Sequence, residues 1–153
     1  MHTLTNRKSD DTVIDSYSYT YDAANNQTSK VDGRGTTSYT YDDLNRLETV
    51  SEPSGKETSY TFDLAGNRAT EAVTESVYDD VYGSTFSTNV TIYNYDDLNR
   101  LLSTSTEKDG VNIENVIYIY DNNGNQLSVT KSVYKDVYGS LLLTLTNMTC
   151  LTS

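Results

Sequence analysis

Aromatic residues alternate with small polar or β-branched residues at five places along the chain. The pattern appears as Tyr19-Thr20-Tyr21, Tyr39-Thr40-Tyr41, Tyr60-Thr61-Phe62, Tyr93-Asn94-Tyr95 and Tyr118-Ile119-Tyr120. A spacing of two residues places both rings on the same face of a β-strand. The sequence therefore predicts a series of strands, each with one aromatic face.

A turn signal follows each of these strands. An Asp comes directly after the second ring, and a Gly or Asn stands three residues beyond that Asp; the pairs are Asp22 and Asn25, Asp42 and Asn45, Asp63 and Gly66, Asp96 and Asn99, and Asp121 and Gly124. Gly and Asn tolerate a positive φ, and an Asp side chain can accept a hydrogen bond from the backbone two residues on. We expect a type I turn followed by a left-handed residue, which is a common hairpin connection.

The repeats come in two alternating kinds. Asp42 and Asp96 continue as Asp-Leu-Asn-Arg-Leu, whereas Asp22, Asp63 and Asp121 continue toward Asn-Asn-Gln, Gly-Asn-Arg and Gly-Asn-Gln. The segment from Tyr41 to Leu47 is identical to that from Tyr95 to Leu101. Residues 76–84 return at 132–140 with Lys135 in place of Asp79. We expect the first copy to lengthen a hairpin at one edge of the sheet.

These patterns predict an all-β fold, an elongated and curved antiparallel sheet of consecutive hairpins. Leu, Ile, Val and Phe number 13, 5, 12 and 2, a supply near the lower limit for a folded chain, so we expect the 14 Tyr to form the core. The expected organisation is an irregular or frayed segment at 1–15, a repeat array at 16–145 and a truncated tail at 146–153. Position 152 is where the register predicts the next Asp, yet the sequence there is Leu151-Thr152-Ser153, so we expect a fragment of a longer protein.

Composition excludes several functions. The net charge of -11 and the absence of a Lys/Arg cluster argue against nucleic acid and anionic lipid as partners. No apolar run approaches a membrane helix, and residues 1–7 contain no apolar stretch typical of a secretory signal. A single Cys150 and a single His2 leave little for a zinc site, a disulfide or Ser-His-Asp catalysis. We expect no enzyme activity, no cofactor and no metal.

The chain resembles the YD-repeat or RHS-repeat family. The resemblance rests on residues 35–47 and 53–63, which read GTTSYTYDDLNRL and PSGKETSYTFD, and extends over roughly residues 16 to 130. It implies a sheet of hairpins that spirals into a hollow shell, which in polymorphic toxins and insecticidal toxin complexes encloses a toxic polypeptide and in teneurin-like receptors takes part in adhesion. The implied location is secreted or at the cell surface.

The chain also departs from the toxin-bearing members of the family. Its one proline, Pro53, follows Glu52, so the Asp-Pro self-cleavage motif has no counterpart. We expect no cargo domain within this stretch, and we expect five units to be too few to close a shell. The resemblance therefore implies a structural wall segment whose partners are the remaining repeats of a longer protein.

Three alternatives stay open at this point. The tyrosine stripe could bind carbohydrate or a cell-surface receptor rather than serve as structure. The turn at Asp121-Asn122-Asn123-Gly124-Asn125 could hold calcium, although it lacks the spacing of an EF-hand loop. The pairs Asp42-Asp43 and Asp96-Asp97 could suggest acid–base catalysis, but adjacent strand residues face opposite sides.

The residues expected to carry the structural repeat are therefore the ring pairs, the Asp residues and the turn residues. They are Tyr19, Tyr21, Asp22, Tyr39, Tyr41, Asp42, Asn45, Arg46, Tyr60, Phe62, Asp63, Gly66, Tyr93, Tyr95, Asp96, Asn99, Arg100, Tyr118, Tyr120, Asp121 and Gly124.

Overall fold

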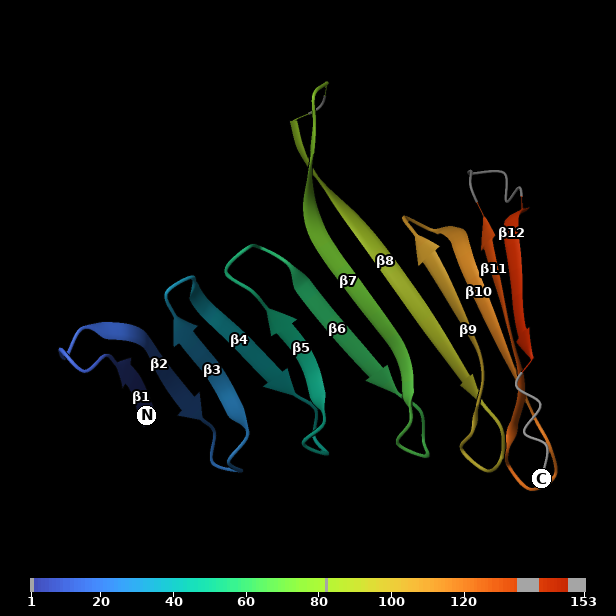
Figure 1. The fold of residues 1–153 in the computed structure, drawn as a ribbon, viewed down its shortest axis with the longest axis horizontal. Helices are drawn as coiled ribbons and strands as arrows, with labels where there is room; N and C mark the ends of the chain where they lie inside the picture. The colour runs from blue at the N-terminus through green and yellow to red at the C-terminus, as the bar shows by residue number, and fades with distance from the viewer. Residues whose placement is uncertain (1, 82, 135–140, 149–153) are drawn as a thin grey trace. The chain divides into compact units, whose positions relative to one another are not determined.

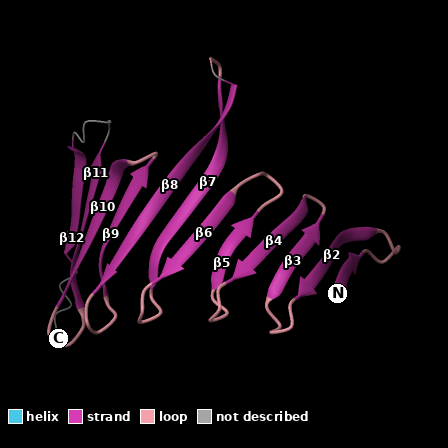
Figure 2. Cartoon of the chain, turned by 180° about the vertical axis from the view of Figure 1, so that it is seen from behind, coloured by secondary structure: helices cyan, strands magenta, loops and turns pink. Residues whose placement is uncertain are grey.

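The computed structural model describes residues 2–81, 83–134 and 141–148. These residues form strands, turns and loops (Figure 2). The strands are β1 (His2–Arg7), β2 (Val13–Tyr21), β3 (Gln27–Asp32), β4 (Gly35–Tyr41), β5 (Leu47–Ser51), β6 (Glu57–Phe62), β7 (Arg68–Asp79), β8 (Gly83–Tyr95), β9 (Leu101–Lys108), β10 (Val111–Tyr120), β11 (Gln126–Tyr134) and β12 (Leu141–Met148). Within this described part, no helix is long and apolar enough to cross a membrane.

The strands are hydrogen-bonded to their neighbours in chain order, from β1 to β12 (Figure 1). Pairings such as β2 with β3, β4 with β5, β8 with β9 and β10 with β11 are antiparallel. The expectation of an all-β sheet of consecutive hairpins is therefore confirmed.

Internal contacts divide the chain into two compact units. The first comprises Met1–Tyr60 and Val73–Phe86, and the second comprises Thr61–Ala72 and Ser87–Ser153. Strands β1 to β5 belong to the first unit, and strands β9 to β12 belong to the second.

The first fifteen residues contain regular structure. Strand β1 pairs with β2 so that His2 lies opposite Tyr19 and Leu4 opposite Tyr17, with one register shift near Arg7. Because residues 2–7 alternate Thr with other side chains, they suit a strand. The proposed division of the chain after residue 15 and after residue 145 stays a prediction.

The repeated phrase at residues 76–84 lies at the end of the longest hairpin. Strands β7 and β8 contain 12 and 13 residues, which confirms the expected lengthening. The two strands lie in the interior of the strand order and not at its edge. The second copy of the phrase falls largely at 135–140, outside the described residues, as do Cys150 and the chain end near residue 152.

A β-bulge follows the turns that close the hairpins of β2, β4, β8 and β10. Thr40 lies opposite Thr49, whereas its neighbour Tyr41 lies opposite Leu47, so Glu48 is the extra residue. The Thr40 hydroxyl contacts both the Thr49 hydroxyl, at 2.7 Å, and the Glu48 carboxylate, at 3.4 Å. Both residues of the bulge therefore lie on the face that Thr40 occupies, and the rings lie on the other face.

The expectation that the tyrosine rings form a buried core is wrong. Val116 is the only buried apolar residue in the described part of the chain, and most repeat rings are half-buried, with Tyr21 43% exposed. The reason is that a sheet of one layer covers its side chains only by their neighbours on the same face. Tyr39 and Tyr41, for example, lie opposite Val50 and Leu47 on the neighbouring strand, and no second layer covers them in the described part of the chain.

Candidate functional site: the tyrosine–aspartate turns

Each repeated Asp closes a hairpin by the same backbone geometry. At the second turn, the Asp42 amide donates to the Arg46 carbonyl at 2.9 Å, and the Asn45 amide donates to the Asp42 carbonyl at 2.9 Å. Asn45 has a φ of 59°. The residues at the matching position of the other four turns, Asn25, Gly66, Asn99 and Gly124, also have positive φ. The predicted turn with a left-handed residue is therefore confirmed.

The Asp carboxylate binds the inside of its own turn. In the second turn, Asp42 Oδ1 accepts from the amides of Leu44 and Arg46, both at 2.9 Å. Donation by the Arg46 amide to the charged carboxylate lowers the pKa of Asp42 below its usual value. The backbone amides of Asn26 and Arg100 lower the pKa of Asp22 and Asp96 in the same way. The pKa of Asp63 and Asp121 is lowered first by the side-chain amides of Asn67 and Asn125, and then by their backbone amides.

The residue four positions after the Asp distinguishes the two kinds of turn: it is Arg in one kind and Asn in the other. In the Arg kind, the Arg46 guanidinium pairs with Asp42 Oδ2 at 2.7 Å, and the Arg100 guanidinium pairs with Asp96 Oδ2 at 2.6 Å. In the Asn kind, an amide takes this place, as in the 3.0 Å bond from Asn26 Nδ2 to Asp22 Oδ2. In both kinds of turn, Oδ2 of the Asp therefore has a bonding partner within its own turn.

Neighbouring turns are joined through the same residues. Asn26 Nδ2 donates to Asn45 Oδ1 at 2.8 Å in the first unit, and Asn67 Nδ2 donates to Asn99 Oδ1 at 2.9 Å in the second. An Asn-kind turn therefore bonds to the left-handed Asn of the Arg-kind turn that follows it. This linkage was not predicted, although its signal is present in the sequence. One Asn stands four residues after the Asp of the first turn, and a second Asn stands three residues after the Asp of the next turn.

The Arg-kind turn makes a different link to its successor. The Arg100 guanidinium lies 4.9 Å from the centre of the Tyr120 ring, and its Nη1 donates to the Asp121 carbonyl at 3.3 Å. The Arg side chain thus covers an aromatic face and bonds to the next turn.

Tyrosine hydroxyls join neighbouring hairpins on the ring face. Tyr41 donates to the Gln27 carbonyl at 2.9 Å, and Tyr120 donates to the Leu101 carbonyl at 2.9 Å. In both cases the acceptor stands five residues after the Asp of the preceding turn. Tyr95 has no such bond in the described structure, and Phe62 has no hydroxyl to give. Burial raises the pKa of the Tyr41 hydroxyl, which keeps it protonated as a donor.

The remaining ring residues lie on the same side of their strands. Tyr39 lies opposite Val50, Tyr93 opposite Thr104 and Tyr118 opposite Val129. The ring centres of Tyr17 and Tyr19 lie 6.5 Å apart. Tyr60 is half-buried on β6.

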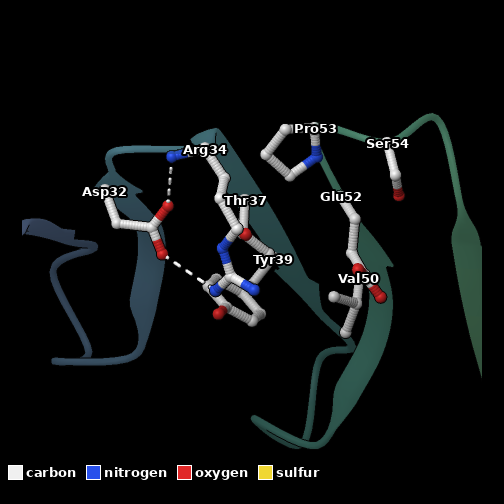
Figure 3. A pocket seen from close by; sticks show the side chains of 8 residues that line it. All are labelled: Asp32, Arg34, Thr37, Tyr39, Val50, Glu52, Pro53 and Ser54. Atoms are coloured by element: carbon white, nitrogen blue, oxygen red, sulfur yellow. Dashed lines mark hydrogen bonds and ion pairs between the residues drawn. The ribbon is translucent and has the colours of Figure 1, made fainter.

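A hollow of about 480 Å³ opens beside Tyr39 in the first unit (Figure 3). Asp32, Arg34 and Glu52 supply charged groups around it, and Pro53 stands at its rim. The Arg34 side chain donates to Asp32 Oδ2 at 3.1 Å, which lowers the pKa of Asp32 below its usual range. The hollow thus combines one ring with an ion pair that is already formed.

The structure also locates the residues of the calcium and acid–base alternatives. Asp121 Oδ1 accepts from the amides of Asn123 and Asn125, and its Oδ2 accepts from Asn125 Nδ2 at 2.9 Å. The turn therefore uses the oxygens that calcium would need, and the described residues contain no cluster of three or more metal-binding side chains. Asp42 likewise bonds within its turn, while its neighbour Asp43 is exposed.

Comparison with known proteins identifies the repeats. The RHS-repeat family model matches residues 21–57 and 41–76. No curated protein matches the chain.

Several solved structures contain similar regions. A crystal structure of TcdB2–TccC3 with Cdc42 is 13% identical, with a TM-score of 0.35 over 93% of this chain and 12% of that chain. A Tc holotoxin pore from Photorhabdus luminescens is 16% identical, with a TM-score of 0.33 over 88% and 9%. A protein of unknown function from Bacteroides fragilis is 12% identical, with a TM-score of 0.26 over 97% and 92%. The chain spans about a tenth of the length of the toxin chains.

The RHS-repeat matches on residues 21–76 coincide with the turns at Asp22, Asp42 and Asp63. The turns at Asp96 and Asp121 continue the same geometry beyond them. Residues 21–76 of this chain therefore match the RHS-repeat family.

Proposed function

We propose that this chain is a structural stretch of wall within a longer, toxin-like RHS-repeat protein, and that it has no catalytic activity of its own. The observation that carries the proposal is the bond from one turn to the next, from Asn26 to Asn45 and from Asn67 to Asn99. Repeat proteins derive their stability from such interfaces between neighbours.

The burial of the side chains supports the same function. A hairpin alone is at best marginally stable in water, and on the ring face the hydroxyls of Tyr41 and Tyr120 bond to the preceding hairpin. Such a sheet suits a surface that is extended by adding repeats. The enclosed polypeptide, and a secreted or cell-surface location, belong to the proposal for the whole protein.

Two matched Asn variants test the wall function. Asn26→Ala removes a bond within its own turn and the bond to Asn45, whereas Asn125→Ala removes only bonds to Asp121. Hydrogen exchange measured by mass spectrometry should show faster exchange in both the β2–β3 and β4–β5 hairpins for Asn26→Ala. The Asn125→Ala change should be confined to the β10–β11 hairpin. Unchanged exchange around Asn45 in Asn26→Ala would contradict the proposal.

Carbohydrate binding is the second candidate, and the hollow beside Tyr39 is the feature that favours it. A half-buried ring such as that of Tyr39, with charged and hydroxyl groups nearby, can stack on a sugar and hydrogen-bond its hydroxyls. A glycan array separates the two functions. The wall function predicts no bound glycan, whereas carbohydrate binding predicts a signal that Tyr39→Ala abolishes.

A further inference from the structure

The turn between β9 and β10 bonds to strand β8. Asp109 and Gly110 have positive φ, at 50° and 81°, and join Lys108 to Val111, which lie opposite each other. They form the two-residue loop that suits a hairpin. The Asp109 amide donates to the Thr88 carbonyl at 2.8 Å, and Asp109 Oδ1 accepts from the Thr88 amide at 2.7 Å. The turn therefore occupies both backbone groups of Thr88.

A second contact closes the same place. The Ser87 hydroxyl donates to Asp109 Oδ2 at 3.0 Å, and Ser87 is only 9% exposed. Ser87, Thr88 and Asp109 all belong to the second unit. Donation by the Thr88 amide lowers the pKa of Asp109, so its carboxylate is charged at neutral pH.

These bonds lie where the pairing of β8 with β9 ends. The last pair of that ladder is Asn89 with Lys108, whereas β8 begins at Gly83. Residues 83–88 therefore have no partner on β9. The Thr88 amide and carbonyl are the first groups that an added strand would bind if it continued the ladder along β8.

An uncovered strand edge pairs readily with other chains. In a strand, the backbone groups of alternate residues point to the same neighbour, so those of Phe86 face the same side as those of Thr88. The Phe86 side chain is 75% exposed and would add apolar contact for an incoming strand. Proteins commonly protect such edges with charged side chains.

We propose that Asp109 protects the edge of β8, because it occupies the backbone groups of Thr88 and prevents residues 83–88 from pairing with an edge strand of another chain. This role differs from that of the repeated Asp residues. Asp42, for example, bonds to the amides of Leu44 and Arg46 inside its own turn, whereas Asp109 bonds to a strand outside its hairpin.

A matched pair of Asp variants tests the proposal. Asp11 has a φ of 64° in the β1–β2 turn, and the described structure gives its carboxylate no bond. Asp109→Gly and Asp11→Gly each remove one negative charge, and glycine accepts positive φ without strain. In sedimentation equilibrium of the full chain at about 1 to 200 μM, Asp109→Gly should associate about tenfold more tightly than the unmodified chain. Asp11→Gly should match the unmodified chain.

Hydrogen exchange measured by mass spectrometry locates the new contact. At low concentration, residues 83–88 should exchange faster in Asp109→Gly, because the Thr88 amide has lost its acceptor. Raising the concentration should restore protection there, since an added strand bonds to these residues. A purely stabilising role for Asp109 would give no such concentration dependence.

The conservative variant Asp109→Asn completes the test. Asparagine also tolerates positive φ, and its side-chain oxygen can accept from the Thr88 amide, so this variant should associate no more than the unmodified chain. Equal association of Asp109→Gly and Asp11→Gly would overturn the proposal. So would protection of residues 83–88 that does not change with concentration, or association of Asp109→Asn as tight as that of Asp109→Gly.

Discussion

Removing one tyrosine hydroxyl should show how strongly neighbouring hairpins are joined. Tyr41 and Tyr95 occupy the same position in identical heptapeptides. Tyr41 donates to the Gln27 carbonyl of the preceding hairpin, at 2.9 Å, whereas the described structure gives the Tyr95 hydroxyl no such bond. Tyr41→Phe and Tyr95→Phe therefore make the same chemical change in two different environments.

The hydrogen bond sets the expected difference. A typical hydrogen bond contributes about 0.5–1.5 kcal/mol to the free energy of unfolding, and the Tyr41 ring is only half-buried. We expect Tyr41→Phe to lower that free energy by about 1 kcal/mol. Tyr95→Phe should change it by less than about 0.5 kcal/mol, as a surface substitution does.

Urea unfolding followed by far-ultraviolet circular dichroism measures both effects. With a denaturant dependence of about 2 kcal/mol per molar urea, the Tyr41→Phe midpoint should fall by about 0.5 M. The Tyr95→Phe midpoint should shift by no more than about half of that.

Equal losses in the two variants would refute this reasoning. Such a result would mean that the hydroxyl contributes through solvation or ring packing and not through the bond to Gln27. Tyr120→Phe extends the test, because Tyr120 donates to the Leu101 carbonyl in the same geometry.

Three further predictions concern the turns. Gly35→Ala should destabilise the chain by more than about 1 kcal/mol, because Gly35 has a φ of 131° and an added Cβ would lie 2.9 Å from the Pro53 side chain. Gly33→Ala is the control, since an added Cβ there meets open space. A urea midpoint as low in the control as in Gly35→Ala would contradict the prediction. Asn45→Ala should cost about 1–2 kcal/mol at a left-handed φ of 59°, whereas Asn45→Gly should cost less in the same urea titration. Acid should destabilise the fold, because the pKa of Asp42 is lowered in the folded chain. Its contribution to stability is complete well above the unfolded pKa of about 3.9 and is lost as the pH falls through the folded value. The urea midpoint should therefore drop as the pH falls below about 4, and less so in Asp42→Asn.

Local sequence determines most of the hairpin geometry, which is why it could be predicted. The two-residue spacing of rings fixes one face of each strand, and an Asp followed by Asn or Gly fixes the turn. The positive φ of Asn45 and Gly66 is one that those residue types tolerate, and their place three residues after the Asp is what predicts it.

The sequence did not reveal how side chains meet between repeats. The bond from Asn67 to Asn99 joins residues 32 positions apart, and that separation depends on the inserted length of β7 and β8. The degree of burial was overestimated for a related reason. Counting rings gives the apolar supply, but only the presence of a second layer decides whether Tyr41 is enclosed or half-covered.

The alternation of the two turn kinds constrains how such an array can grow or shrink. Because Asn26 needs the left-handed Asn45, and Asn67 needs Asn99, the smallest interchangeable module is a pair of hairpins. Loss or gain of a single hairpin would set two turns of one kind side by side and leave their linking groups mismatched. Recombination between copies should therefore be tolerated in even steps.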